Sequence, residues 1–298
     1  MNFGKIIGNQ DVKDYLSKSI ETNNIMHSYL FSGTEGIGKK IIAKEFAKKI
    51  LCENTKEETC TCKSCTCFDS GNHPDFSILN EDGKGIGVDS IRNITEKVIE
   101  KPILSNRKVY IINDSEMLNT ESQNSILKTL EEPPEFVTFI LITSNENLLL
   151  NTIKSRCMTI KFKDIPDDIL EKFATEIVGY ENLSHNQLKS FRGSIGNCIK
   201  FKENSEKYLN IENLINNLSK KDIIDIMLNA KIIYDKDNIY DILDYIIVCL
   251  YELSKENRNY LNCIEHVNKC ITKLKANANF DMSIDTLLLN MWEEVKWE

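Results

Sequence analysis

The fold is decided by one stretch, Gly33-Thr34-Glu35-Gly36-Ile37-Gly38-Lys39-Lys40. It directly follows the apolar run His27–Ser32, which predicts a β-strand, and it leads into a helical pattern. Glycines separated by four residues and followed by a lysine have the spacing of a phosphate-binding loop. Glycine lets backbone N–H groups curl around a phosphate, and the start of a helix adds partial positive charge. We therefore predict a nucleotide-binding loop that is lined by Gly33, Gly36, Gly38 and Lys39.

Around this loop, residues 1–163 alternate short apolar runs with helical patterns, which predicts an α/β domain with a parallel sheet. The further candidate strands are Phe76–Leu79, Lys108–Ile112, Phe136–Thr143 and Met158–Phe162. The run 136–142 is apolar almost throughout, as expected of a parallel strand that is covered on both faces. Thr120-Glu121-Ser122-Gln123 has the pattern of a capping box and predicts the start of a helix.

The strand signal ends at Ile165-Pro166. Residues 164–205 predict a small unit of short helices, and residues 206–298 predict a second all-helical unit. An apolar face over residues 239–250 predicts the core of that unit, an oligomer interface or both, and periodicity does not separate these. We expect Trp292 and Trp297 to lie in packing or at an interface, as aromatic enrichment suggests.

Composition and charge narrow the class of protein. A chain of 298 residues is long enough for roughly two or three units, and its 41% hydrophobic content is that of a globular protein. No apolar run approaches the roughly 18 residues of a membrane span, so we expect a cytoplasmic protein that binds no membrane. A net charge of −8 argues against nucleic-acid binding by the isolated chain, and we expect partners to supply most phosphate contacts.

The predicted loop lacks the residues that normally hold Mg²⁺. A working loop has Ser or Thr after its lysine, and this chain has Lys40. The second ligand should be an Asp at the end of a later apolar strand, where this chain has Asn113. An amide oxygen is a poorer magnesium ligand than a carboxylate, and the metal supplies much of the charge neutralisation in phosphoryl transfer. Asp114 and Glu116 are the alternative ligands, and Asn113 with Asp114 forms the degenerate metal motif.

Several stretches are more specific than the loop. They are His27-Ser28-Tyr29-Leu30-Phe31-Ser32-Gly33, Gly71-Asn72-His73-Pro74-Asp75, Asn124-Ser125-Ile126-Leu127-Lys128-Thr129-Leu130-Glu131-Glu132-Pro133-Pro134 and Thr152-Ile153-Lys154-Ser155-Arg156-Cys157. Together they resemble the subunits of the AAA+ clamp-loader family of the bacterial DNA polymerase III holoenzyme. The resemblance implies a RecA-like α/β P-loop domain with a Cys-rich zinc insertion, then a small helical lid and an all-α collar.

The resemblance also implies a function. Clamp loaders are pentamers that open a ring-shaped sliding clamp and close it around primed DNA, with ATP sites between neighbouring subunits. The arginine of the Ser-Arg-Cys triplet reaches the neighbour's site, which implies that Arg156 acts as an arginine finger in trans. The alternative is a surface arginine at a strand start. The implied partners are the gamma/tau and delta subunits, with the sliding clamp and primed DNA reached through the complex.

The departures from the family pattern separate two types of subunit. Besides Lys40 and Asn113, Gly196 stands where family ATPases carry a sensor arginine. Residues 143–145 are either the family's first sensor or a simple turn. This combination resembles the delta-prime subunit, which implies a part of a DNA-directed DNA polymerase holoenzyme without ATPase activity of its own. Whether the loop holds ATP or ADP is left open, and Mg²⁺ is not expected. The alternatives are an active gamma/tau-like ATPase and a zinc-binding DNA adaptor.

Half of the ten cysteines fall between residues 52 and 67, namely Cys52, Cys60, Cys62, Cys65 and Cys67. Four thiolates close in sequence suit tetrahedral Zn²⁺ in a structural site, and the alternative is a chance cluster of free thiols. The family has a zinc module at this position, about residues 50–70 here, with the spacing Cys-x8-Cys-x2-Cys-x2-Cys. This chain departs from that spacing in the first two gaps. The expected ligands are Cys52, Cys60, Cys62 and Cys65, with Cys67 as the alternative to Cys60. We expect His73 to order the turn before Pro74, with metal ligation as the alternative.

Overall fold

The computed structural model describes residue 3 and residues 6–54, 60–81, 83, 85–181 and 183–296. The chain forms two compact units, Met1–Ile165 and Pro166–Glu298, and each is described here by itself. None of the helices in the described part combines the length and the apolar character that crossing a bilayer requires.

A five-stranded parallel sheet lies at the centre of the first unit, with the strand order β2-β3-β4-β1-β5. The strands are β1 (Ser28–Ser32), β2 (Phe76–Leu79), β3 (Lys108–Ile112), β4 (Val137–Thr143) and β5 (Met158–Lys161). Every residue of the three central strands β1, β3 and β4 is buried, because helices cover both faces of the sheet. The predicted strands are confirmed to within one residue at each end.

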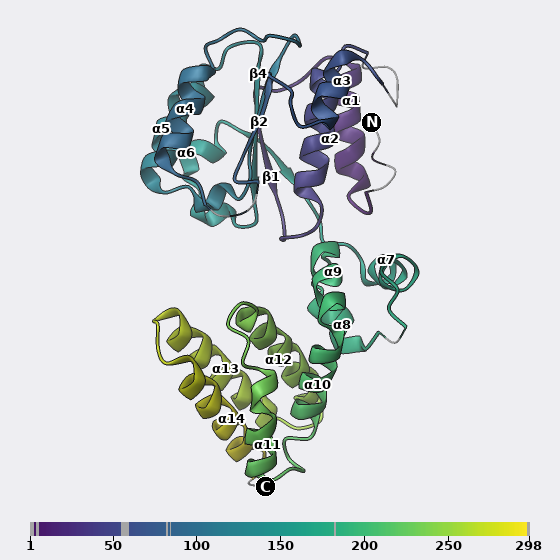
Figure 1. The fold of residues 1–298 in the computed structure, drawn as a ribbon, viewed down its shortest axis with the longest axis vertical. Coiled ribbons are helices and arrows are strands. Elements are labelled where there is room, and N and C mark those ends of the chain that lie inside the picture. The colour runs from purple at the N-terminus through teal and green to yellow at the C-terminus, as the bar shows by residue number, and fades with distance from the viewer. Residues whose placement is uncertain are drawn as a thin grey trace. The chain divides into compact units, whose positions relative to one another are not determined.

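Figure 1 shows α1, α2 and α3 on one side of this sheet and α4, α5 and α6 on the other. Their bounds are α1 (Gln10–Glu21), α2 (Lys39–Leu51), α3 (Lys63–Asp69), α4 (Val88–Lys97), α5 (Thr120–Glu131) and α6 (Asn151–Lys154), with short turns η2 (Ser115–Met117) and η3 (Glu146–Leu148). Two apolar layers result, one on each side of the sheet. Leu16 of α1 and Ala43 of α2 are fully buried in the first layer, and Ile126 of α5 is fully buried in the second.

The register of the sheet brings together the segments that follow the central strands. Ser32 at the end of β1 lies beside Thr143 at the end of β4, and Ile112 at the end of β3 lies beside Leu141. Gly33 donates its N–H to the carbonyl of Thr143 at 3.3 Å. The predicted loop, the residues after β3 and the residues after β4 therefore share one edge of the sheet, where ligands bind in folds of this kind.

The second unit consists of helices over its described residues (Figure 1). They are α7 (Asp167–Phe173), the π-helical turn η4 (Ala174–Val178), α8 (His185–Ser190), α9 (Ile195–Glu203), α10 (Ser205–Asn216), α11 (Ile223–Asn229), η5 (Ala230–Ile232), α12 (Ile239–Leu253), α13 (Asn259–Lys275) and α14 (Phe280–Lys296). The apolar face of α12 is buried against α8, α10 and α13, so it forms core. Trp292 donates its indole N–H to Lys221 O at 3.0 Å, and Trp297 lies outside the described residues. The division into a lid over 164–205 and a collar over 206–298 stays a prediction.

The start of α5 differs from the sequence prediction. Thr120 was expected to cap the helix, but it is the first helical residue and Asn119 is the N-cap. The Asn119 side chain accepts a hydrogen bond from Ser122 N at 2.8 Å. Gln123, expected to complete a capping box, instead donates to Leu118 O at 2.9 Å and accepts from Leu150 N at 2.8 Å. Tertiary contacts thus use the glutamine that the pattern assigned to the cap.

We expect Asn119→Ala to lower the free energy of unfolding of the first unit by about 1 kcal/mol, because one N–H at the start of α5 loses its acceptor. Thr120→Ala is the matched control and should change it by less than half as much. The measurement is urea unfolding of the full chain, with hydrogen exchange at β3 and β4 to report the first unit. A larger loss of stability with Thr120→Ala than with Asn119→Ala would show that Thr120, and not Asn119, is the N-cap of α5.

Candidate functional site

The turn between β1 and α2 has a conformation that requires glycine. Gly33, Gly36 and Gly38 have positive φ angles of 154°, 75° and 95°. A Cβ on Gly33 would meet the carbonyl oxygen of Phe162 at 2.7 Å, so a side chain there would displace backbone. Because Gly38 is the residue before α2, the free N–H groups of the first helical turn face the loop. This arrangement fits a bound phosphate.

Lys39 is the first residue of α2, and its side chain is buried. Its Nζ donates to Gly33 O at 2.6 Å and to Thr34 O at 2.7 Å, so the ammonium is folded back onto its own loop. Burial lowers the pKa of Lys39, while the charges of Glu116 and Glu35 oppose that shift. Phosphate oxygens are stronger acceptors than these carbonyls, so the ammonium can exchange from the loop to a phosphate.

The two positions that normally serve Mg²⁺ lie side by side at the edge of the sheet. Lys40 donates from Nζ to Glu81 O at 3.0 Å. Asn113, directly after β3, is buried and donates from Nδ2 to Asn80 O at 3.2 Å. The ammonium and the amide therefore bind the carbonyls of consecutive residues that follow β2.

Asp114 and Glu116, the alternative metal ligands, are both engaged. One oxygen of Asp114, Oδ2, accepts from Asn113 Nδ2 at 2.9 Å and from Asn80 Nδ2 at 3.1 Å. Burial raises the pKa of Asp114, and the charges of Glu116 and Glu35 add to this. Glu116 Oε1 accepts from the N–H of Ser144 at 2.9 Å and from the Ser144 hydroxyl. Burial acts to raise the pKa of Glu116, but these hydrogen bonds outweigh it and the pKa is lowered. Within the described part of the chain, Glu116 Oε2 is buried without a hydrogen-bond partner.

Magnesium therefore does not fit this site in the usual way. A P-loop site offers Mg²⁺ a hydroxyl after the lysine and a carboxylate at the end of a strand. Here an ammonium and an amide occupy these positions, and Asp114 is bonded to two amide groups. The loop and Lys39 fit a phosphate, but the residue types at the two usual metal-ligand positions, Lys40 and Asn113, do not fit Mg²⁺.

The residues after β4 have structural partners. Ser144 binds Glu116, and Thr143 Oγ1 accepts from Asn145 N at 3.0 Å. In the second unit, Gly196 is the second residue of α9, whose N-cap Ser194 accepts from Asn197 N at 3.2 Å.

Arg156 lies in the turn between α6 and β5, at the surface of the first unit. One guanidinium nitrogen lies 2.5 Å from Glu131 Oε1, and the other donates to Thr152 O at 2.8 Å and Ser155 Oγ at 3.3 Å. Its side chain remains 31% exposed. Glu131 is the last residue of α5, so two of the four sequence stretches that carry the resemblance, 124–134 and 152–157, meet at this ion pair.

The structure brings four of the five clustered cysteines together. Ligand atoms of Cys52, Cys60, Cys62 and Cys65 all lie within 4.8 Å of one another, and the Sγ atoms of Cys52 and Cys62 are 4.0 Å apart. Four thiolates around Zn²⁺ at about 2.3 Å would set sulfur–sulfur distances of about 3.8 Å, so the group fits a tetrahedral metal. Cys67, on α3, is not in the group that the described residues form. Residues 55–59, within the predicted module, lie outside the described residues.

Two of these thiols differ in acidity. Burial raises the pKa of Cys52. Burial acts the same way on Cys62, but hydrogen bonds from the backbone of Cys65 and Glu53 and from neighbouring thiols outweigh it and lower the pKa of Cys62 to about 7. Cys198, Cys249, Cys263 and Cys270, in the second unit, are buried, as expected of inert thiols.

His73 connects the cysteine cluster to the phosphate-loop helix, a role that the sequence pattern did not reveal. Its Nδ1 accepts from Asp75 N at 3.1 Å, so the proton is on Nε2, which lies 2.9 Å from Ser64 Oγ and 3.2 Å from Ser105 Oγ. Both serine hydroxyls donate to the carbonyl of Leu51, the last residue of α2. The network fixes the end of α2 beside Cys52.

Asp75 anchors the other side of this network. Its carboxylate accepts from the backbone N–H groups of Ile103, Leu104 and Ser105 at 2.7 to 2.8 Å. The segment that leads into β3 is therefore bonded to the cysteine module and to α2. The sequence contained one signal for this, the Asn-His-Pro-Asp stretch, but its partners are distant in sequence.

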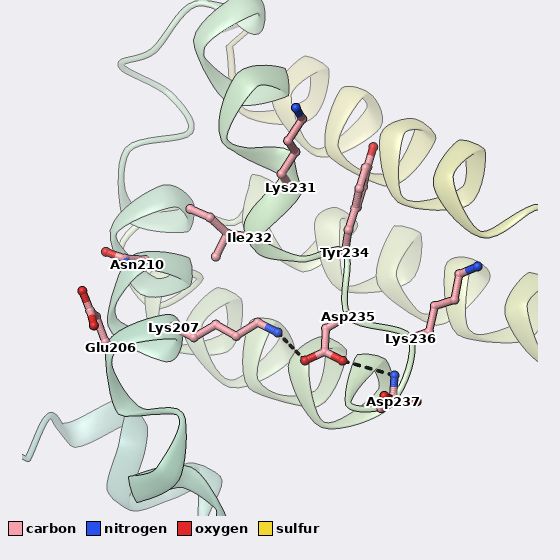
Figure 2. A pocket seen from close by; sticks show the side chains of 9 residues that line it. All are labelled: Glu206, Lys207, Asn210, Lys231, Ile232, Tyr234, Asp235, Lys236 and Asp237. Carbon is pink, nitrogen blue, oxygen red and sulfur yellow. Dashed lines mark hydrogen bonds and ion pairs between the residues drawn. The ribbon is translucent and has the colours of Figure 1, made fainter.

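A hollow in the second unit has no comparable chemistry (Figure 2). Figure 2 shows Lys207 and Asp235 pointing toward each other, with Nζ 2.6 Å from Oδ2. Asp235 also accepts from Asn238 N and Asn238 Nδ2, so it holds the turn before α12. The polar contacts that line the hollow hold the turn between η5 and α12 against α10.

The parallel sheet and the glycine turn between β1 and α2 define a P-loop protein with the architecture of the nucleoside triphosphatases. A family model described as DNA polymerase III, delta subunit, matches residues 8–166. This protein is a member of the DNA polymerase III clamp-loader family.

The relatives agree with this assignment. DNA polymerase III subunit delta' of Bacillus subtilis is 36% identical over 161 residues, which are 54% of this chain and 49% of that protein. DNA polymerase III subunit tau/gamma of Haemophilus influenzae is 34% identical over 183 residues, 61% of this chain and 26% of that protein. The chain thus spans about a quarter to a half of these relatives. A DNA polymerase III gamma subunit-related protein from Thermotoga maritima shares the fold, with 16% identity, a TM-score of 0.52 and coverage of 95% of this chain and 99% of that one.

We expect the first unit to lose stability as the pH falls below about 6.5, the ordinary pKa of histidine. Burial lowers the pKa of His73, so the unfolded chain binds a proton more readily than the folded one. The stability that neutral His73 contributes is fully present above the pKa that His73 has in the unfolded chain. It is lost as the pH falls from that value toward the lower pKa of His73 in the folded chain. His73→Gln should flatten this dependence in urea unfolding. His185→Gln, at an exposed histidine of the second unit, is the control and should leave the slope unchanged.

Proposed function

We propose that this protein is the delta-prime-type subunit of a DNA polymerase III clamp loader. It assembles with gamma/tau and delta subunits to load the sliding clamp on primed DNA, does not hydrolyse ATP itself and supplies Arg156 to a neighbouring subunit. The observation that carries this proposal is the pairing of a site without magnesium ligands, at Lys40 and Asn113, with a partly exposed arginine fixed at the protein surface.

The absence of hydrolysis follows from the chemistry of the loop. Phosphoryl transfer depends on charge neutralisation and positioning by the metal ion. Lys40 and Asn113 cannot ligate Mg²⁺ as a hydroxyl and a carboxylate do, and Gly196 has no side chain to act as a sensor in the second unit. Sequence identity alone does not separate the two subunit types, because this chain is 36% identical to a delta' relative and 34% identical to a tau/gamma relative. The site residues favour the delta-prime type over an active gamma/tau-like ATPase.

The contacts of Arg156 support a role in trans. Ion pairs at this degree of exposure contribute little to stability, so the Glu131 contact serves mainly to orient the guanidinium. An oriented guanidinium is suited to the oxygens of a γ-phosphate, where an arginine finger contributes about 10³- to 10⁵-fold in rate. In this proposal residues 164–205 act as a lid and residues 206–298 as the collar that holds the assembly together.

We also propose that Cys52, Cys60, Cys62 and Cys65 hold a structural Zn²⁺. The support is their common position and the thiol donor set, which leaves no open coordination position for catalysis. The ion would link the end of α2, which Cys52 follows, to α3, which contains Cys65. It would therefore reinforce the same junction that His73 and the two serines hold.

Arg156→Ala is expected to reduce clamp- and DNA-stimulated ATP hydrolysis by the reconstituted loader at least tenfold, because one site loses its finger. The isolated wild-type chain should show no ATP hydrolysis. Arg92→Ala removes another surface arginine of the first unit, paired with Glu121, and should leave the rate unchanged. Hydrolysis by the isolated chain, or an unchanged rate with Arg156→Ala, would favour the gamma/tau-like ATPase.

Cys65→Ser should abolish retention of zinc by the purified chain and lower the melting temperature of the first unit, because folding and metal binding are coupled. Cys67→Ser is the matched control, on the same helix and outside the group of four. Zinc content is measured by elemental analysis of protein prepared with zinc present. If Cys67→Ser loses zinc and Cys60→Ser retains it, the fourth ligand is Cys67.

A further inference from the structure

The two substitutions in the magnesium position have a combined effect on charge. Replacing a hydroxyl with the ammonium of Lys40 adds one positive charge. Replacing a carboxylate with the amide of Asn113 removes one negative charge. Together the two replacements make the side chains of the site more positive by two units, which is the charge that Mg²⁺ would bring.

The structure brings both changed side chains to the same segment of backbone. Lys40 binds Glu81 O and Asn113 binds Asn80 O, so the two side chains meet at adjacent residues after β2. The charge of Lys40 acts on Asp114, the residue after Asn113, together with that of Lys39. The ammonium of Lys40 is therefore part of the same electrostatic neighbourhood as the phosphate-loop lysine.

The charge of Lys40 attracts the Glu81 carboxylate and, besides Lys44, helps to lower the pKa of Glu81, but the two side chains are not the partners of one hydrogen bond. Lys40 contacts the backbone carbonyl of Glu81, whereas the Glu81 carboxylate is paired with Lys44. The hydrogen bond and charge of Lys44 lower the pKa of Glu81, which keeps that ion pair intact at neutral pH. Lys40 can exchange a neutral carbonyl for a charged phosphate oxygen, which is a gain in hydrogen-bond strength.

Two nearby acids, Asp114 and Glu116, have hydrogen-bond partners of their own, while Glu35 and Asp164 also act on the charge of Lys39. Asp114 accepts from two amides through one oxygen, and Glu116 is bonded to Ser144 and is the acid with the largest effect on Lys39. Glu116 thus acts as a counter-charge to the loop lysine.

We infer that the loop binds a nucleoside triphosphate without a divalent cation, with the ammonium of Lys40 in the place of Mg²⁺. The nucleotide would be a static ligand of the loop between β1 and α2. This inference rests on the proposed function in one respect, that the loop does not hydrolyse what it binds.

The test is calorimetric titration of the full chain with ATP, once with excess EDTA and once with Mg²⁺. The wild-type dissociation constants should agree within about threefold, a difference under 1 kcal/mol. Lys40→Thr should weaken binding in EDTA by at least about tenfold, because a charge close to the phosphates is lost. Lys48→Thr, on the same helix but paired with Asp69, is the control and should bind as wild type does.

The double variant Lys40→Thr with Asn113→Asp restores both usual ligand types, and its binding should become dependent on Mg²⁺. Wild-type binding that requires Mg²⁺, or no wild-type binding in either buffer, would overturn the inference. Neither result affects the clamp-loader role, which the Arg156 assay tests separately. Tight magnesium-independent binding with an inert Arg156 variant would support the inference and count against the proposed function.

Discussion

The parallel pairing of β1, β3 and β4 is the constraint on which the rest of the site depends. Parallel strands end at a common edge, and here the Gly33 N–H bonds directly to Thr143 O across that edge. Residues more than a hundred positions apart are thereby held within a few ångströms. Burial of all three strands makes this register hard to change, because a slip by one residue would turn apolar side chains toward the wrong layer.

Helix α2 connects the phosphate loop at the sheet edge to the cysteine cluster. Its N-terminal end carries the phosphate loop and Lys39, and its C-terminal end is held through Leu51 O by two serines and by His73 next to the cysteine cluster. A metal in that cluster would reinforce the end of α2 that is farthest from the phosphate loop. The cysteine module and the phosphate loop are thus mechanically connected through one helix.

The electrostatics of the edge differ from those of a hydrolytic site. Lys40 and the buried amide of Asn113 stand where the usual metal ligands would be. Asp114, the next residue, is bonded to two amides. Arg156, by contrast, lies at the surface and is oriented by Glu131. This distribution of charge supports the proposed role, in which the subunit stabilises a neighbour's phosphate and does not cleave its own.

Much of this protein could be predicted from sequence, because the decisive signals are local. The strands of residues 76–79 and 108–112 and the glycine turn follow from short-range pattern and spacing, whereas the choice of four cysteines among five rested on the family resemblance. Tertiary structure decided what sequence spacing cannot encode: that Asn119 caps α5, that His73 joins Ser64 to Ser105, and that Glu131 orients Arg156. At the start of α5, tertiary contacts engage Gln123 in place of the local capping pattern. The other three contacts join residues 9 to 32 positions apart. The physical reason is that hydrogen-bond partners are chosen by proximity in the folded chain, which only the packed sheet and helices determine.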